Sequence, residues 1–511
     1  MSDYREHAPP TPLLVGYDPC VDLPPDHLAR FVEMIVEECA RPLEKPGGKG
    51  QPQYDPRLLL KVLVYAYATG VRSSRTMERL CHESLPYLFL TRGDAPSYRT
   101  LCNARLDYRS DLEEVWTAMF ATASRAGIRR LGRVVLDSTK IRANASGESV
   151  VRQSEYDAVL EELARILGEA AFADESEEEE GLAVQTTTGQ VVKLDQMRDI
   201  LRRVRGGLRA AKHGEDAPPP VATGVSFEML VRIEQARSAL EEARATGLKH
   251  VSVTDPDARM MGEGCQKQIK ECHSFEVGVD NGLLVAGEST QVGPDNRRLE
   301  PLVEAAKEHE PDGLTAVDAD SGYYSGETVG RLLEAGLDTC IPDSNVARDL
   351  HTGRKAGKTR DSVRGNVPLT YDSEEDCYRC PEGNALVRIQ RRLDKGQFVT
   401  TYRAKEDCRC CRLASECLTQ PKAKHKTLKV ADRSETLETA RQRFSEPEHI
   451  ARYRRRGPAV ETVFAYMRTV LGYTRWLLRG KEPVRAEATL FKVAYQTRKI
   501  HLRWAAAMQI G

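Results

Sequence analysis

The order of strand and helix patterns after residue 133 constrains the fold of this chain most. RVVLDSTKI is a short β-branched run, and after a long interruption HSFEVGVD and LLVAGEST follow as two strand patterns joined by Asn281-Gly282, a strong hairpin signal. Helix and strand patterns then alternate through NRRLEPLVEAAKEH, GLTAVDAD, SGETVGRLLEAG and LDTCIPD. Three strands in a meander followed by alternating β and α units predict an α/β fold with a mixed sheet flanked by helices.

This order is that of an RNase H-like fold, and it predicts five parts of the chain. We expect an all-helical, DNA-binding N-terminal domain over residues 1–132 and a core sheet over 133–142 with 250–345. An acidic helical insertion should span 143–249, and a cysteine-rich insertion without regular patterning should span 346–425. Basic helices over 426–511 should complete the core. In the first part, arginines near helix ends are compatible with a helix-turn-helix-like module: Arg72, Arg75, Arg92, Arg99 and Arg105.

The net charge of −1 averages two segments of opposite sign. The chain has 75 Lys and Arg against 76 Asp and Glu, but residues 151–180 hold eleven acids and two arginines. Residues 421–511 instead hold 20 basic residues and eight acidic ones. Because basic segments attract phosphates locally, within a screening length of roughly 8 Å, the near-zero total does not exclude a nucleic-acid partner. The alternative interpretation is that these charge runs are only the solvent-exposed faces of helices.

Three acidic residues stand out by position. Asp137 ends the first strand pattern, Asp320 ends the fourth, and Glu461 lies within the helical pattern RRGPAVETVFAYMR. The first and fourth strands of an RNase H-like sheet are neighbours, so the two aspartates should meet, with a later helix supplying the glutamate. Two Mg²⁺ ions about 3.5–4 Å apart would cancel their repulsion and support phosphodiester displacement. Asp318, on the same strand as Asp320, is the alternative.

Several dispersed stretches resemble the DDE transposases of bacterial insertion sequences, in the subgroup with a helical domain before the first Asp. They occur in the family's order over most of residues 25–505: VLDSTKIRANAS, TDPDARMM, HSFEVGVDNGLL, VDADSGYYSGE and YRRRGPAVETVFAYMRTVLGYTRWLLRG. The resemblance implies that Asp137, Asp320 and Glu461 take the three catalytic, metal-binding positions. It implies two Mg²⁺ ions as cofactor, with Mn²⁺ as a substitute.

The resemblance also implies a signature of Tyr, Arg, Glu and Lys on one helix. It falls on Tyr453, Arg456, Glu461 and position 468, which is Arg here. Arg468 keeps the charge and can hold a phosphate with two hydrogen bonds, so we expect function to survive this departure. Tyr453 should position a phosphate or a base, unless it only packs on the helix face.

Two further arginines are candidates for DNA contacts. Arg475 and Arg479 lie beside Trp476 and could grip the end of a mobile element. The indole of Trp476 could stack on an unpaired base, or it could equally be a core residue.

Six of the thirteen cysteines gather between residues 346 and 425. Cys377 with Cys380 and Cys408 with Cys411 form two C-x₂-C pairs, which resemble a zinc ribbon although the 27 residues between them exceed the usual spacing. The resemblance to the transposase family would instead select Cys380, Cys408, Cys411 and Cys417, with Cys377 as the alternative ligand. A reduced, cysteine-rich loop without Zn²⁺ is the other interpretation.

The leading interpretation is a DDE transposase that cleaves the ends of an insertion sequence and joins their 3′-hydroxyls to target DNA. Its partner would be double-stranded DNA, held by a homodimer because two ends must be brought together. No long apolar segment and no secretion signal is present in the sequence, so we expect no membrane contact and a bacterial cytoplasmic, nucleoid-associated location. The alternatives are a catalytically silent, transposase-derived DNA-binding protein and an RNase H-like nuclease without strand transfer.

Overall fold

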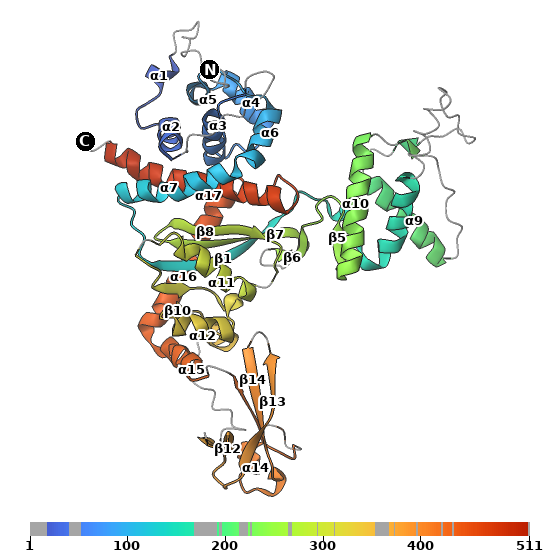
Figure 1. Cartoon of the computed structure of the whole chain (residues 1–511), viewed down its shortest axis with the longest axis vertical. Helices are drawn as coiled ribbons and strands as arrows, with labels where there is room; N and C mark the ends of the chain where they lie inside the picture. Colours follow the sequence, from blue (N-terminus) through green and yellow to red (C-terminus); the bar gives the residue numbers. More distant parts are fainter. Residues whose placement is uncertain are drawn as a thin grey trace.

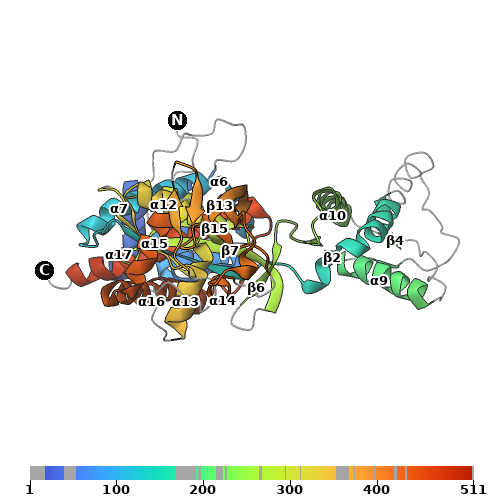
Figure 2. The ribbon, with the colours of Figure 1, turned by 90° about the horizontal axis from the view of Figure 1, so that it is seen from below.

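The chain forms a central mixed sheet with three attachments (Figure 1). N-terminal helices lie on one side of the sheet, a smaller sheet lies at the opposite end, and a helical insertion projects sideways in both views (Figures 1 and 2). The computed structural model describes residues 18–39, 53–167, 192–193, 197–213, 223–224, 227–263, 268–293, 295–310, 312–352, 367–372, 374–394, 397–418, 420, 423–431 and 434–508. No helix in these ranges combines the length and the hydropathy that crossing a bilayer requires.

The central sheet has the strand order of an RNase H-like fold. Its strands are β1 (Arg133–Arg142), β6 (Arg259–Glu263), β7 (Gln268–Asp280), β8 (Leu283–Thr290), β9 (Ala316–Asp318) and β10 (Asp338–Cys340). They run in the order β10-β9-β1-β7-β6, and β8 also pairs with β7. The β1–β9 and β9–β10 pairs are parallel, whereas the pairs that involve β7 are antiparallel. The predicted mixed sheet is confirmed, including the adjacency of its first and fourth strands.

The tight turn between β7 and β8 explains why the meander forms where the sequence predicts it. Asn281 has φ 47° and Gly282 has φ 78°. Both residues tolerate this left-handed region, which two-residue hairpins of the type I′ class require. On both sides of the turn the strands carry buried apolar residues, which are Phe275, Val277 and Val279 on β7 and Leu283 to Ala286 on β8. The hairpin therefore anchors β7 against β1 within the main core.

Helices cover both faces of the sheet and continue its core. Helix α11 packs on β1, β7 and β8, α16 packs on β1, and α17 joins β8 to the N-terminal helices. The helices and short 3₁₀ turns of this region are η3 (Asp295–Arg297), α11 (Leu299–Lys307), η4 (Ser321–Tyr323), α12 (Gly326–Glu334), α13 (Ser344–His351), α15 (Ser434–Gln442), η6 (Arg443–Ser445), α16 (Pro447–Thr469) and α17 (Lys481–Met508).

The N-terminal part is all-helical within the described residues. It comprises α1 (Pro19–Asp22), α2 (Leu28–Cys39), α3 (Pro56–Ala68), α4 (Ser74–Glu83), α5 (Leu85–Thr91), α6 (Tyr98–Asp107) and α7 (Arg109–Arg125). The Asp55 carboxylate caps α3 by accepting from the Arg57 N–H, and Pro56 occupies the first turn. Except for Arg57, every residue of α3 is buried. Since α17 packs on α3 and α7, these helices share one core with the sheet.

Three of the five arginines that are compatible with a helix-turn-helix-like module in this part have internal partners. Arg72 and Arg105 are buried, and Arg105 donates to the carbonyl oxygen of Arg72. Arg92 pairs with Glu33. Their positive charges stabilise the domain internally, which leaves Arg75 and Arg99 as the exposed members of the predicted set.

The helical insertion has its own hydrophobic core. It contains η1 (Gly147–Ser149), β2 (Val150–Arg152), η2 (Gln153–Glu155), a helix over 156–167, β3 (Val192–Lys193), α9 (Met197–His213), β4 (Thr223–Gly224) and α10 (Phe227–Thr246). Strand β2 pairs with β5 (His250–Ser252) where the chain returns to the sheet. Apolar residues of the three helices form a separate buried cluster. The acidic run 174–180 lies outside the described residues.

The cysteine-rich segment contains a regular sheet, so the expectation of an unpatterned segment is wrong. Five antiparallel strands run in chain order: β11 (Thr370–Asp372), β12 (Cys377–Arg379), β13 (Ala385–Asp394), β14 (Gln397–Ala404) and β15 (Thr427–Ala431). The alternation in ALVRIQRRLD is the signal that could have predicted β13. Two short turns near the cysteines, η5 (Cys408–Cys410) and α14 (Ala414–Cys417), complete this part.

Candidate active site

Asp137 and Asp320 occupy matching positions at two adjacent strands. In the parallel pair of β1 and β9, Val135 lies opposite Asp318, and each aspartate follows two residues later. Strand β9 ends at Asp318, and Asp320 caps η4 by accepting a hydrogen bond from the Gly322 N–H at 2.8 Å. The prediction that Asp320 ends the strand is therefore wrong by two residues, because the chain has already turned into η4.

The charge of Asp137 is only partly compensated within the protein. Burial raises the pKa of Asp137 to about 6, the Arg456 guanidinium opposes this rise, and the negative charge of Asp320 adds to it. Nη1 of Arg456 lies 3.1 Å from Oδ2 of Asp137. Asp320 has no cationic partner within 4 Å among the described residues. The one arginine that contacts this pair of carboxylates reaches Asp137, which leaves excess negative charge that a bound cation would neutralise.

Asp318, the alternative to Asp320, is held by ion pairs inside the protein. Its side chain is 1% exposed and lies between two arginines. Arg133 Nη2 lies 2.7 Å from one carboxylate oxygen, and Arg452 Nε lies 2.9 Å from the other. Both oxygens of Asp318 are thereby satisfied by cations from β1 and α16. This environment leaves little reason for a further positive ion at Asp318.

Glu461 lies on α16, the helix that crosses β1. Arg456 of this helix reaches Asp137, and Arg468 donates to the Thr139 hydroxyl of β1. Glu461 and Arg468 are seven residues apart and therefore share a helix face. The carboxylate of Glu461 is exposed and has no hydrogen-bond or ion-pair partner among the described residues. The structure thus brings Asp137 and Asp320 together and places Glu461 on the helix segment between two contacts to β1.

The other C-terminal candidates fall into different environments. Tyr453 is half-buried against Phe444. Arg475 and Arg479 are exposed, and Arg479 donates to the carbonyl oxygen of Asn144.

Trp476, by contrast, is fully buried and packs edge-on against Phe275 and Tyr473. Of the two interpretations of this indole, the structure supports the core residue. Its ring is closed off from solvent by the aromatic cluster, so it has no face on which a base could stack.

A polar network that the sequence patterns do not predict supports β1 from neighbouring elements. Lys140 Nζ lies 3.0 Å from Asp295 Oδ1, which also accepts from the Ser138 hydroxyl. On β7, opposite Ser138, the buried Glu276 accepts from Arg298 at 2.7 Å. Burial raises the pKa of Glu276 to about 7 despite this arginine. The clue in the sequence was Lys140 in DSTK, three residues after Asp137.

The chemistry of the donor set suits a hard divalent cation, although ligand oxygens of the three carboxylates do not all lie within 4.8 Å of one another. Mg²⁺ prefers carboxylate oxygens, and here Asp320 and Glu461 have no cationic partner among the described residues, while Asp137 has one. Burial raises the pKa of Asp137 and the negative charge of Asp320 adds to the rise, so a bound cation would favour the ionised carboxylates.

The cysteine-rich part brings together the four cysteines that the resemblance to the transposase family selects as zinc ligands. Cys380, Cys408, Cys411 and Cys417 all line one small hollow. Backbone N–H groups point at two of the sulfurs, from Leu413 to Cys411 and from Lys426 to Cys408, each at 3.4 Å. Such N–H groups stabilise thiolates, which is the form that binds Zn²⁺. The four sulfurs do not all lie within 4.8 Å of one another, so a closed tetrahedral site would require them to draw together.

Cys377, the alternative ligand, lies apart from this hollow. It forms a group with Asp372 and Glu375 whose ligand atoms lie within 4.8 Å of one another. Both carboxylates of that group already pair with Arg379, at 3.1 and 2.7 Å. The arginine already compensates the charge of both carboxylates, so this group is better explained as an ion-paired turn.

Comparison with protein families agrees with this architecture. The fold and its paired aspartates define an α/β protein of the RNase H-like class. Residues 379–501 match the transposase DDE domain family, and residues 21–107 match the transposase domain family DUF772. These two matches support a DDE-type transposase of the insertion-sequence kind. Glu461 falls within the first match, whereas Asp137 and Asp320 fall outside both. No curated protein matches the chain.

Proposed function

We propose that the protein cleaves the ends of an insertion sequence and joins their 3′-hydroxyls to target DNA, with Asp137, Asp320 and Glu461 as the catalytic carboxylates. The observation that carries the proposal is the placement of Asp137 on β1 and of Asp320 just after the end of the adjacent parallel strand β9, with Arg456 paired to Asp137. Divalent ions bound there would activate a water or a 3′-hydroxyl and stabilise the leaving oxygen of an in-line displacement.

The residues around the carboxylates have distinct proposed roles. Arg456 orients Asp137 and offsets part of its charge before a cation binds. Arg468, which contacts Thr139, fixes where α16 lies along β1 and thereby the position of Glu461. The α16 helix contributes Tyr453 to the same surface, where it would position a phosphate or base.

The remaining parts would bind and arrange the DNA. We assign the N-terminal helices and the exposed Arg475 and Arg479 to the recognition of element ends, with residues 346–425 as a zinc-stabilised module. A homodimer that acts on nucleoid DNA in the bacterial cytoplasm would bring the two ends together. These assignments rest on charge, exposure and the transposase family.

A strand-transfer assay tests the proposal. Labelled DNA that carries the element ends is incubated with the protein, Mg²⁺ and a target plasmid, and the products are separated on a denaturing gel. Labelled ends joined to the plasmid support the transposase. Cleavage without joining would instead support a nuclease, and a salt-sensitive gel shift without any cutting would support a silent DNA-binding protein.

A further inference from the structure

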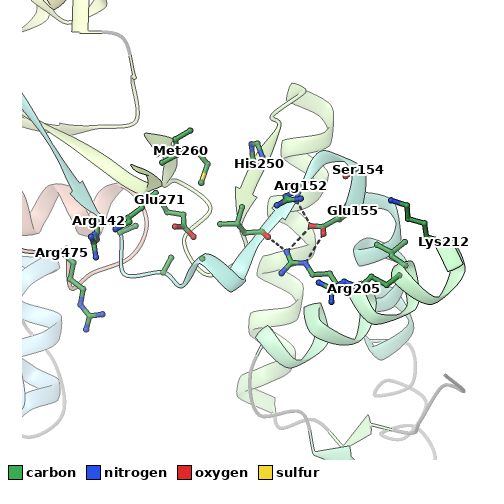
Figure 3. Close-up of a pocket in the computed structure, with 18 residues that line it drawn as sticks. Arg142, Arg152, Ser154, Glu155, Arg205, Lys212, His250, Met260, Glu271 and Arg475 are labelled. Atoms are coloured by element: carbon green, nitrogen blue, oxygen red, sulfur yellow. Dashed lines mark hydrogen bonds and ion pairs between the residues drawn. The ribbon is translucent and has the colours of Figure 1, made fainter. Parts of the chain in front are cut away.

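A basic cleft separates the core sheet from the helical insertion. Its volume is about 1140 Å³. Figure 3 shows Arg142 and Arg475 on the core side and Arg152, Arg205 and Lys212 on the insertion side. Two glutamates line the cleft, against seven lysines and arginines: Arg142, Arg152, Arg205, Arg209, Lys212, Lys270 and Arg475. Both walls therefore carry positive charge.

The cations on the insertion wall form a stripe along one helix. Arg205, Arg209 and Lys212 follow one another at spacings of four and three residues on α9, so they share one face. Arg205 is committed to Glu155, with Nε 3.1 Å from its carboxylate. Arg209 and Lys212 are exposed and have no acidic partner within 4 Å among the described residues. Facing walls of like charge repel each other, so a polyanion between them would stabilise the cleft.

Exposed apolar side chains lie in the same cleft. Leu208, Met260 and Ile269 are 40%, 36% and 69% exposed, and all three line it. Leu208 comes from α9, whereas Met260 and Ile269 come from β6 and β7. Apolar groups among cations suit a ligand with both charged and apolar surface, such as the phosphates and sugar rings of a nucleic-acid backbone.

The cleft begins at the far end of the strand that carries Asp137. Arg142 is five residues further along β1, which at roughly 3.3 Å per residue corresponds to about 17 Å. The N–H of Trp476 donates to the Arg142 carbonyl oxygen at 2.9 Å, and this contact fixes Arg475 at the same end. DNA rises about 3.4 Å per base pair, so a duplex cut at Asp137 would reach the cleft after about five base pairs.

We propose that this cleft binds the phosphate backbone of duplex DNA, independently of sequence, about five base pairs from the scissile bond. The identity of that DNA as the substrate of the carboxylate site rests on the proposed function, whereas the binding itself does not. Arg209, Lys212 and Arg475 contact the phosphates, and Arg205 holds α9 in position through Glu155 and the backbone of η1 and β2.

Salt-dependent binding tests the proposal with the full chain. Affinity for a 40-base-pair duplex of arbitrary sequence is measured by fluorescence anisotropy at several salt concentrations. The variant Arg209→Ala/Lys212→Ala should bind about tenfold more weakly at physiological salt, and the slope of log affinity against log salt should fall by about two. The control Arg232→Ala/Arg244→Ala removes two exposed cations of α10 that do not line the cleft, and should keep the wild-type slope.

An unchanged slope in the Arg209→Ala/Lys212→Ala variant would overturn the proposal. A variant that lost affinity for single-stranded DNA but not for duplex DNA would overturn it as well. Cleavage is measured separately on the same proteins. A wild-type protein that does not cut DNA but shows the expected slopes would lose the proposed function and keep this site. A protein that cuts DNA while the double variant binds like the wild type would keep the function and lose the site.

Discussion

Asp137 and Arg456 are 319 residues apart in the chain, and their side chains lie 3.1 Å from each other. This ion pair joins the strand that carries the first proposed catalytic aspartate to the helix that carries Glu461. A second contact between α16 and β1, from Arg468 to Thr139, lies two residues further along the strand. The geometry of the proposed site therefore depends on α16 packing against β1.

Asp318 and Asp320 should respond in opposite ways to neutralisation. Asp318→Asn removes the carboxylate charge beside Arg452, whose side chain is 10% exposed and keeps Asp338 as a partner, and should lower the free energy of unfolding by about 1–3 kcal/mol. Asp320→Asn keeps the cap on η4 and should leave stability nearly unchanged. Urea denaturation of both variants checks this pair, and equal stability of the two would contradict the structural role of Asp318.

Glu276 should make stability depend on pH. Its pKa is raised from 4.5 to about 7 by burial, so between these values the unfolded chain loses the proton while the folded chain keeps it. The wild type should therefore lose stability relative to Glu276→Gln as pH rises from about 4.5 to 7, by on the order of 3 kcal/mol. Unfolding of both proteins across this range measures the difference. A difference independent of pH would refute the assignment.

The buried pair of Arg72 and Glu487 should hold the N-terminal helices to the loop before α17. Glu487 is fully buried, and its second oxygen accepts from the Leu477 and Leu478 N–H groups. Glu487→Gln should lower the free energy of unfolding by about 3–5 kcal/mol, because Arg72 remains charged in the interior. Glu482→Gln breaks an exposed pair with Arg109 and should cost less than about 1 kcal/mol. Comparable losses in the two variants would contradict this account.

The cysteine hollow should bind one Zn²⁺ in protein purified under reducing conditions. Elemental analysis should find about one zinc per chain in the wild type and in Cys410→Ser, whose exposed thiol is next to the proposed ligands but does not line the hollow. Cys411→Ser should lose the metal, and the surrounding sheet should then become sensitive to protease, since such small sites fold with their ion. Wild-type protein without zinc would favour the reduced loop.

Much of the core could be predicted because its signals are local. The Asn281-Gly282 turn and the β-branched first strand determine the meander, and the strand order then places Asp137 beside Asp320. The choice between Asp320 and Asp318 depends on the arginine partners of Asp318, which come from 185 and 134 residues away. No sequence window contains both members of such a pair.

The errors have the same physical origin. The sequence makes Arg72 compatible with a DNA-binding module and leaves Trp476 open between base stacking and the core, but Arg72 is neutralised by Glu487 and Trp476 is enclosed by Phe275 and Tyr473. Both contacts form only when the N-terminal helices, the sheet and α17 assemble. Lys140 was missed because its partner Asp295 lies in a separate turn after β8.

Cleavage by single carboxylate variants tests the central claim most directly. The rate of Mg²⁺-dependent cutting at an element end is measured for Asp137→Asn, Asp320→Asn and Glu461→Gln, with DNA affinity measured in parallel. Each should be slowed at least about a thousandfold, because each removes a metal ligand worth several kcal/mol in the transition state, while DNA affinity stays near wild type. Full activity in Asp320→Asn would contradict the proposed site and favour Asp318.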